Sequence, residues 1–474
     1  MMARTSLQED FGAYRFQLAY MAYALALAHI HRLPAAPGLF RAPFAQLIEK
    51  LKSPDVWSYW HFASVGAGPF SHGHAQGQPQ WDPIIRDNIM YSAYLQSTSL
   101  LYHYLFNDGR YAEPGALTLS FKPAFWGPEK RFVYDERSLN EHIYWLMVER
   151  GYLGVACEPN CVFQVCNQVP ILGFRLHDLV YGGDLAGEVT QGYLKAWEQF
   201  GVVNARGHFN VLVLEHERTL VSPESPWSDF WLGALMHSWN PATVQANYPA
   251  QIARWRARAP DGSMFIDVNP NVVRNPERAS ARDFGWAAVC ASEVGDTETL
   301  EGLLHYADQH LNPVRRGGAY YYPRNDLLFD DAGYFRAMDP HTGNALLAYA
   351  RLNIAGGLQK LYAGAWPPTH FADPALDQVS DAVDVLFAHY SAVQGTLRLR
   401  IAPSEPAALG CRMRISNVAA DRSWRLIADG ETLAVVVGSK VSCATGRAHI
   451  AFEGTALSIE MPLDGELKLD LHRA

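Results

Sequence analysis

The sequence predicts a mainly helical protein whose helices pair into a closed toroid, an (α/α)6 barrel, followed by a small antiparallel β-sandwich. Three observations favour this fold. Segments with helical hydrophobic periodicity follow one another along most of the chain, short turns with Gly or Pro separate them, and the periodicity changes to two near residue 393. We therefore expect residues 1–392 to form the barrel and residues 393–474 to form the β domain.

Length and composition suit this assignment. The chain has 474 residues, 49% of them hydrophobic, so it can bury a large core and form more than one domain. The net charge of −9, without basic runs interleaved with aromatic residues, argues against a nucleic-acid partner. The most apolar early run, 18–28, is too short to span a bilayer. The acidic N-terminus is not typical of an export signal, so we expect a cytoplasmic protein with six reduced cysteines.

The helical segments show apolar residues at helical spacing and end at turn residues. The expected helices are 14–31, 44–52, 84–106, 138–150, 163–181, 185–200, 228–237, 241–258, 280–292, 297–308 and 343–353. An open solenoid of helix pairs is the alternative to a closed toroid. A solenoid should show sequence similarity at a fixed period, and none is found.

Beyond residue 393, apolar and polar residues alternate in short segments separated by turns such as Asp-Gly. The expected strands are 397–401, 412–415, 433–437, 448–452 and 467–471. This pattern is typical of a small antiparallel β-sandwich. The β domain carries no evident reactive cluster, and we expect it to pack on the barrel.

Three of the six cysteines, Cys157, Cys161 and Cys166, fall within ten residues. They follow a small apolar stretch and lead into the helix expected from residue 163. A thiol near a helix N-terminus meets unpaired N–H groups and the positive end of the helix dipole, which favour the thiolate. The cluster can equally be a set of small buried side chains. The spacing, without a matched histidine pair, argues against zinc.

Two stretches carry a resemblance to a known family: residues 157–167, CEPNCVFQVCN, and residues 81–95, WDPIIRDNIMYSAYL. Both resemble signature motifs of the linalool dehydratase/isomerase family, and fainter similarity extends the resemblance over roughly residues 14–365. The resemblance implies an (α/α)6 barrel and a small terpenoid substrate. It also implies a reaction without cofactor or metal, in which water leaves an alcohol or a hydroxyl migrates across an allyl system.

The resemblance implies that Cys157 and Cys166 are two active-site thiols flanking the reacting carbon. The side chains expected to line the pocket are Met90, Tyr91, Phe163, Trp227 and Trp231. Ordinary core packing would also explain these large apolar residues. The founding enzyme completes its site with a neighbouring subunit, but the segment that reaches across is expected to be absent here, so the resemblance leaves both a homo-oligomer and a monomer open.

The sequence departs from the family at several acid–base positions. Tyr94 stands where the family has a catalytic histidine, and Phe16 stands where it has a tyrosine. The segment that carries the family's acidic residue and second tyrosine is expected to be absent. Tyr94, Glu158 and Asp229 are candidate substitutes, Glu158 as a buried acid with a raised pKa and Asp229 as a proton donor. Glu158 could instead be a surface or capping carboxylate, and Asp229 an ordinary first-turn acid of a helix.

The sequence thus predicts a lyase or isomerase that dehydrates, isomerises or cyclises an apolar terpenoid alkenol or polyene. Motifs for diphosphate ionisation, protonation-initiated cyclisation and nucleotide binding are not found. Two alternatives stay open. One is a carbohydrate-active lyase, epimerase or hydrolase on the same barrel, and the other is a binding protein that has lost its chemistry.

Overall fold

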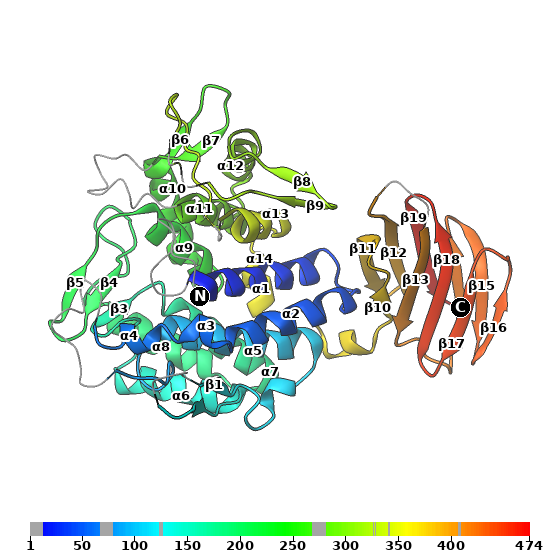
Figure 1. The fold of residues 1–474 in the computed structure, drawn as a ribbon, viewed down its shortest axis with the longest axis horizontal. Coiled ribbons are helices and arrows are strands. Elements are labelled where there is room, and N and C mark those ends of the chain that lie inside the picture. Colours follow the sequence, from blue (N-terminus) through cyan, green and yellow to red (C-terminus); the bar gives the residue numbers. More distant parts are fainter. Residues whose placement is uncertain are drawn as a thin grey trace. The chain divides into compact units, whose positions relative to one another are not determined.

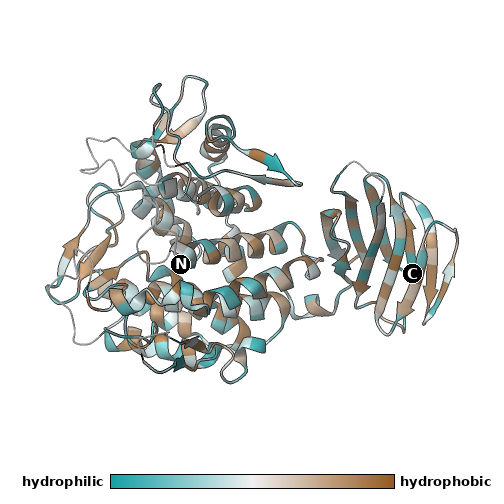
Figure 2. Cartoon of the chain, viewed as in Figure 1, coloured by the Kyte–Doolittle hydropathy of each residue, from teal (hydrophilic) through white to brown (hydrophobic). Residues whose placement is uncertain are grey.

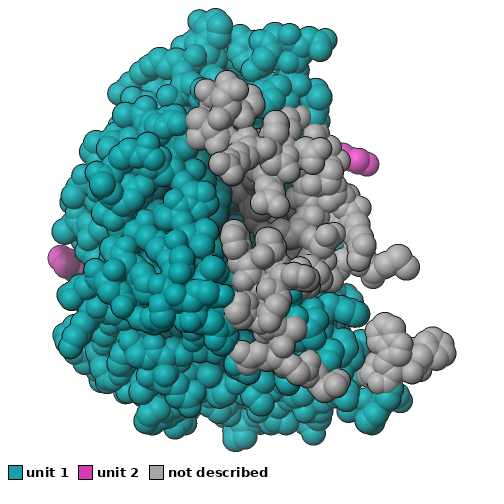
Figure 3. All heavy atoms as spheres, turned by 90° about the vertical axis from the view of Figure 1, so that its left-hand side faces the viewer, with its two compact units in different colours: residues 1–24, 46–314, 320–364 teal, residues 25–45, 315–319, 365–474 magenta. Residues whose placement is uncertain are grey.

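The computed structural model describes residues 13–66, 79–122, 127–267, 281–325, 327, 329–339, 342–405 and 409–474. The chain forms two compact units, one mainly helical and one built mainly from β strands (Figure 1). Residues 1–24, 46–314 and 320–364 form the helical unit, and residues 25–45, 315–319 and 365–474 form the β unit; Figure 3 shows them in teal and magenta. Among the described residues, no helix is both long and apolar enough to cross a bilayer. The acidic N-terminal stretch on which the export expectation rests lies outside the described residues.

Helices follow one another along the first three quarters of the chain. They are α1 (Ala13–His31), α2 (Gly38–Leu51), α3 (Pro54–Trp57), α4 (Trp60–Ala63), α5 (Ile89–Phe106), α6 (Glu136–Glu149), α7 (Gln168–Tyr181), α8 (Leu185–Trp197), α9 (Pro226–Met236), α10 (Pro241–Trp255), α11 (Ala281–Val294), α12 (Thr297–His310), α13 (Leu347–Leu352) and α14 (Gly357–Tyr362). Helix α5 packs against α7, and α9 packs against α11. The closure of the helix pairs into a six-fold ring stays a prediction.

Short antiparallel strands connect several helices. They are β1 (Leu119–Phe121), β2 (Lys130–Phe132), β3 (Cys161–Phe163), β4 (Leu212–Leu214), β5 (Thr219–Val221), β6 (Arg256–Arg258), β7 (Met264–Ile266), β8 (Val314–Arg316) and β9 (Ala319–Tyr321). Strands β3, β4 and β5 form a three-stranded sheet, and the others pair as hairpins. The cysteine segment therefore enters a sheet before it reaches α7.

Two helices that flank the cysteine segment begin later than predicted. Helix α5 begins at Ile89 rather than residue 84, because Asn88 adopts a left-handed conformation with φ 66° and its side chain donates to the Pro83 carbonyl at 3.0 Å. Helix α7 begins at Gln168 rather than residue 163, because the preceding residues form β3 and pair with β4. The prediction that the cysteines lie in the first turns of a helix is therefore wrong.

Helix α5 runs through the interior, and all but one of its residues are buried. Several of its polar side chains have partners there: the Ser97 hydroxyl lies 3.2 Å from the Tyr23 hydroxyl, and Thr98 Oγ1 donates to a backbone carbonyl one turn earlier at 2.6 Å. Gly173 of α7 faces the Gln96 side chain, where a Cβ atom would lie 2.3 Å from Gln96 Oε1. The glycine therefore permits the close approach of α5 and α7.

The β unit contains two antiparallel sheets, one of four strands in the order β10-β13-β18-β17 and one of six in the order β11-β12-β19-β14-β15-β16. The strands are β10 (Ala375–Val379), β11 (Val383–Ser391), β12 (Thr396–Pro403), β13 (Leu409–Ser416), β14 (Ser423–Ala428), β15 (Glu431–Val437), β16 (Lys440–Cys443), β17 (His449–Glu453), β18 (Ala456–Leu463) and β19 (Leu467–Arg473). Figure 2 shows apolar and polar residues alternating along them, and apolar side chains from both sheets, such as Leu399 and Ile459, share one core. Each of the five predicted strands overlaps one of these.

The β unit begins before the predicted boundary at residue 393. Strands β10 and β11 both precede that residue, and β11 contains a bulge between Val385 and Phe387. The bulge interrupts the period-two pattern by which a strand is recognised in a sequence. Residues 25–45 also belong with this unit, and the Ala35 N–H donates to the Ala388 carbonyl at 3.2 Å.

One buried side chain holds the cysteine segment in place. Asn167 is fully buried; its Oδ1 accepts from the Val155 N–H at 2.8 Å, and its Nδ2 donates to the Val155 carbonyl at 3.1 Å and the Phe163 carbonyl at 2.8 Å. Gly154 makes room for it, with φ +128° and a position at which a Cβ atom would lie 2.6 Å from Asn167 Cγ. The stretch before the first cysteine is thereby tied to the turn after the third.

Replacing Asn167 with Ala should lower the free energy of unfolding of the helical unit by about 2–4 kcal/mol, because three hydrogen bonds are lost and the Val155 amide groups stay buried without partners. Urea unfolding followed by tryptophan fluorescence measures the change. The matched control is Asn247→Ala, which removes one bond to the Thr243 carbonyl at 2.8 Å from a half-buried position. It should cost less than about 1 kcal/mol. Equal losses in the two variants would contradict the role of Asn167.

Candidate active site

The side chains of Cys157 and Cys166 lie together in the interior and share a hydrogen bond. Their exposed fractions are 5% and 4%. The Cys157 N–H donates to the Cys161 carbonyl at 2.9 Å, and Cys166 occupies the turn between β3 and α7. All six cysteines are free thiols. The structure therefore brings together the two thiols that the resemblance singles out, while their catalytic role stays a prediction.

Burial favours the protonated form of both thiols. The hydrogen bond from Cys166 lowers the pKa of Cys157, but burial and the charge of Glu158 outweigh it, and this pKa lies above its ordinary value. Burial, followed by the bond to Cys157, raises the pKa of Cys166 well above its ordinary value. Burial also raises the pKa of Cys161 to about 12. The expectation that a helix N-terminus favours the thiolate is therefore wrong, because desolvation dominates.

Two oppositely charged residues act on the thiol pair. Arg15, in the first turn of α1, is buried, and its guanidinium carbon lies 4.3 Å from the centre of the Phe16 ring and 4.6 Å from that of Tyr59. Beyond burial and the mutual hydrogen bond, the charge of Arg15 lowers the pKa of both thiols, whereas the charge of the half-buried Glu158 raises it. The pair is asymmetric, because Cys157 loses its proton more easily than its neighbour.

Contacts from the start of α5 hold Cys157 from the other side. The Asn88 N–H donates to the Cys157 carbonyl at 3.1 Å, and the Tyr59 hydroxyl donates to Asn88 Oδ1 at 2.5 Å. The backbone of Met90 hydrogen-bonds to the Cys157 thiol. The Met90 backbone thus lies beside Cys157, and the contact of its side chain with a substrate stays a prediction.

Aromatic side chains from α1, α5, α9 and α11 meet in one cluster, which comprises Phe16, Tyr20, Tyr94, Trp231 and Trp286. Phe16 contacts Trp231 edge to face with ring centres 5.6 Å apart, and Tyr94 lies 6.1 Å from Phe16. Trp231 stacks on Trp286 at 5.4 Å. Burial raises the pKa of Tyr94, and the charge of Cys166 adds to this effect. The aromatic cluster therefore lies close enough to Cys166 for the charge of this thiol to act on Tyr94.

The other residues expected in the pocket occupy different surroundings. Trp227 is half-buried, with its ring centre 6.3 Å from that of Trp231. The Tyr91 hydroxyl donates to the Leu51 carbonyl at 3.0 Å and so tethers α5 to α2. Phe163 is half-buried in β3. Contacts between these residues and a substrate stay predictions.

Asp229 lies in the first turn of α9 among hydrogen-bonding partners. Its Oδ2 lies 2.7 Å from His208 Nδ1 and accepts from Trp255 Nε1 at 2.7 Å, and its Oδ1 accepts from the Phe209 N–H at 3.0 Å. Burial raises the pKa of Asp229 although these bonds oppose it. The charge of Asp229 acts on Cys290, whose pKa burial already raises. These contacts join α9 to α10 and to the loop before β4, and a proton-donor role for Asp229 stays a prediction.

The sequence analysis missed several residues of the site, above all Arg15, Tyr59 and Trp286. The sequence does carry a signal for Arg15, because it is a cation next to Phe16 in an otherwise apolar helix. Arg is almost never fully buried unless it is paired. The other two residues are recognisable only from the tertiary contacts. Within the described ranges, no three His, Cys, Asp or Glu side chains gather in a way that could hold a metal ion.

Comparison with solved structures gives distant likenesses. The GH76 α-mannanase of Bacteroides thetaiotaomicron matches with a TM-score of 0.41 and 8% identity, over 74% of this chain and 88% of that chain. A Listeria innocua protein matches with a TM-score of 0.41 and 10% identity, over 75% of this chain and 86% of its own. The endoglucanase CelQ of Clostridium thermocellum matches with a TM-score of 0.35 and 10% identity, over 97% and 84% of the two chains.

Comparison with protein-family models gives a match to linalool dehydratase/isomerase over residues 15–328. The matched region includes the thiol pair, Arg15 and all five residues of the aromatic cluster. It also includes both stretches that carry the resemblance in the sequence. The match covers more than half of the chain, and the chain belongs to the linalool dehydratase/isomerase family.

Proposed function

We propose that this protein is a cofactor-independent enzyme that dehydrates, isomerises or cyclises an apolar terpenoid alkenol or polyene. The reaction takes place where the thiol pair adjoins the aromatic cluster, inside helix pairs that close into an (α/α)6 barrel. The observation that carries the proposal is the hydrogen bond between Cys157 and Cys166, two buried thiols of unequal acidity. Such a pair supplies one proton donor and one proton acceptor within a single site.

In the proposed dehydration the pair carries one proton, with Cys157 as thiolate and Cys166 as thiol. Cys166 gives its proton to the substrate hydroxyl, the C–O bond breaks, and water leaves. Cys157 takes a proton from the adjacent carbon, whose C–H electrons form the new double bond. The hydrogen bond between the sulfurs then returns this proton to Cys166, so the alcohol becomes an alkene and water without net change in the enzyme.

The aromatic cluster suits the charge that develops during this reaction. Ring faces attract a nearby cation, and an apolar wall keeps bulk water from quenching it. Trp231 Nε1 and Trp286 Nε1 are buried and lack a hydrogen-bond partner within the part of the chain that the structure describes. A buried donor without a partner is costly. The hydroxyl of an alkenol is an acceptor that would satisfy one of them.

The proposal is tested by incubating the protein with terpenoid alcohols and polyenes, without added metal, nucleotide or nicotinamide, and following the loss or gain of water by mass spectrometry. Cys157→Ala and Cys166→Ala should each lower kcat by about 10²–10⁴, because each removes a general acid or base. Cys161→Ala is the matched control and should change kcat little, because Cys161 lies in the same buried segment without the shared hydrogen bond.

Equal losses in the three single variants would indicate packing rather than chemistry. Full turnover in the Cys157→Ala/Cys166→Ala double variant would refute the thiol mechanism and move the acid–base role to Glu158, Asp229 or Tyr94. Activity confined to uronic-acid or neutral sugar substrates would favour a carbohydrate-active enzyme instead.

The proposed mechanism has a characteristic pH dependence. The thiolate of Cys157 is the base, and its pKa lies above the ordinary thiol value of 9.0, so kcat/KM should still be rising with pH at that value. The fall at higher pH should follow the deprotonation of Cys166, whose pKa is raised further. A pH–rate profile, with circular dichroism to monitor folding at each pH, measures this. A plateau reached near neutral pH would exclude Cys157 as the base.

The two charges beside the pair should move this profile in opposite directions. Arg15→Gln removes the cation that favours the thiolate, so the rising limb should shift to higher pH by about one unit, and Glu158→Gln should shift it to lower pH. Arg15→Lys should restore most of the wild-type profile. Arg254→Gln is the matched control, because it removes a guanidinium 4.7 Å from the centre of the Trp255 ring without a contact to the thiols. Unshifted profiles in both folded variants would show that the charges do not set the acidity of the pair.

A further inference from the structure

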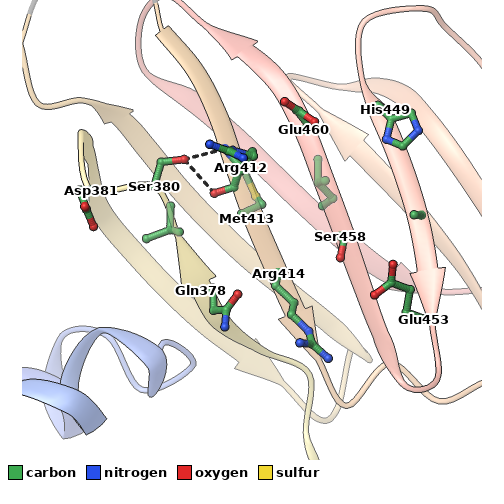
Figure 4. Close-up of a pocket in the computed structure, with 13 residues that line it drawn as sticks. Gln378, Ser380, Asp381, Arg412, Met413, Arg414, His449, Glu453, Ser458 and Glu460 are labelled. Atoms are coloured by element: carbon green, nitrogen blue, oxygen red, sulfur yellow. Dashed lines mark hydrogen bonds between the residues drawn. The ribbon is translucent and has the colours of Figure 1, made fainter.

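A hollow of about 710 Å³ lies on the outer face of the four-stranded sheet in the β unit. Polar side chains from all four strands surround it, among them Gln378 on β10, Arg412 and Arg414 on β13, Glu460 on β18, and His449 and Glu453 on β17 (Figure 4). Its size falls within the range of small-molecule sites, about 300–1,000 Å³.

The strand register creates the hollow. On β13 the alternate residues, such as Met413, face the sandwich core, so Arg412 and Arg414 project from the opposite face. Arg414 stands opposite Ser458 on β18, which in turn stands opposite Ala451 on β17. Two small residues in one row leave a depression between the long side chains of β13 and those of β17.

Among the described residues, the charged side chains around the hollow make few interactions with one another. Within the described chain, the side chains of Arg412, Arg414, Glu453 and Glu460 have no hydrogen bond or ion pair, although Arg412 and Glu460 are direct cross-strand neighbours. Arg414 Nε is shielded from solvent and has no partner among the described residues. An unsatisfied buried donor is costly, and a ligand is one way to satisfy it.

The other sheet provides an internal comparison. Arg398 and Arg400 on β12 have the same spacing and also project outward, but Arg398 donates to Gln394 Oε1 at 2.8 Å and Arg400 lies 3.4 Å from Glu466. The arginines of one Arg-x-Arg pair therefore have partners within the protein. Those of the other pair, on the four-stranded sheet, have none among the described residues. This difference points to an external partner for Arg412 and Arg414.

We infer that the hollow is a binding site for a short oligosaccharide that carries a carboxylate, such as a chain of uronic acids. A carboxylate is the planar anion that arginine binds with two hydrogen bonds, and two arginines two residues apart on one strand face can share it. Sugar hydroxyls both donate and accept, which matches the carboxylates of Asp381, Glu453 and Glu460 and the side chains of His449 and Gln378 around the rest of the hollow. The carboxylates outnumber the two arginines, so the selection of an anion rests on the adjacent guanidinium groups and not on the net charge of the hollow. No Phe, Tyr or Trp side chain is among the described residues that line it, so polar contacts rather than stacking on a large ring would hold the sugar.

Isothermal titration calorimetry of the full chain with trigalacturonate tests the inference, with cellotriose as the neutral trisaccharide. Trigalacturonate should bind at least about tenfold more tightly than cellotriose, and added salt should weaken it. Arg412→Gln/Arg414→Gln should reduce the affinity for trigalacturonate at least about tenfold, because charge-assisted hydrogen bonds are lost. The matched double variant Arg398→Gln/Arg400→Gln should change it less than about twofold.

These arginines are not paired within the described chain, so their removal should leave the melting temperature of the protein unchanged, which differential scanning calorimetry checks. Equal affinity for the charged and the neutral trisaccharide would overturn the inference. So would the absence of binding at millimolar trigalacturonate, or the same loss of affinity in both double variants. None of these outcomes depends on turnover of a terpenoid, so the inference stands or falls apart from the proposed function.

Discussion

The carboxamide of Asn167 is the contact on which the geometry of the candidate site depends. It makes three hydrogen bonds in the interior, and two of them engage both the N–H and the carbonyl of Val155. A side chain that satisfies the amide and carbonyl of one residue acts like a neighbouring strand, so the stretch before Cys157 needs no sheet partner at this point. Asn88 and Ile89 hold the opposite side of the segment through the carbonyls of Cys157 and Ala156. The thiols can therefore meet in a loop that is as well fixed as a strand.

The electrostatics of the site follow from this fixed geometry. Two thiols held in hydrogen-bond contact cannot behave as independent acids, because the proton shared between them stabilises the charge on one sulfur and hinders ionisation of the other. Arg15 and Glu158 then act on a pair that is already unequal. A cation in the first turn of a helix is opposed by the helix dipole as well as by burial. Its position against two ring faces and beside ionisable thiols offsets part of that cost.

How much the sequence reveals depends on whether a signal is local. The thiol pair and the helix succession are recognisable from residues 81–95 and 157–167 and from periodicity, which are local features. The start of α7 is not, because β3 exists only through its pairing with β4, some fifty residues later in the chain. The surroundings of Asp229 also depend on tertiary contacts. From the sequence it has the position of an ordinary first-turn acid, and only the fold shows that His208 and Trp255 contact it. The β unit begins earlier than its alternating pattern indicates, because a bulge in β11 breaks that pattern.

Unsatisfied polar groups in the aromatic cluster support the proposal that it contacts the substrate. Helix α5 buries Ser97, Thr98 and Ser99, and each hydroxyl has a partner within hydrogen-bond distance. Beside this helix, the indole nitrogens of Trp231 and Trp286 are equally buried and have none among the described residues. Tyr94 Oη and Gln96 Oε1 on the same helix also lack a partner among these residues. A buried polar group without a partner in a native protein needs an explanation, and a ligand is one. Under the proposed function, the hydroxyl of the substrate would accept a hydrogen bond from one of these indole N–H groups.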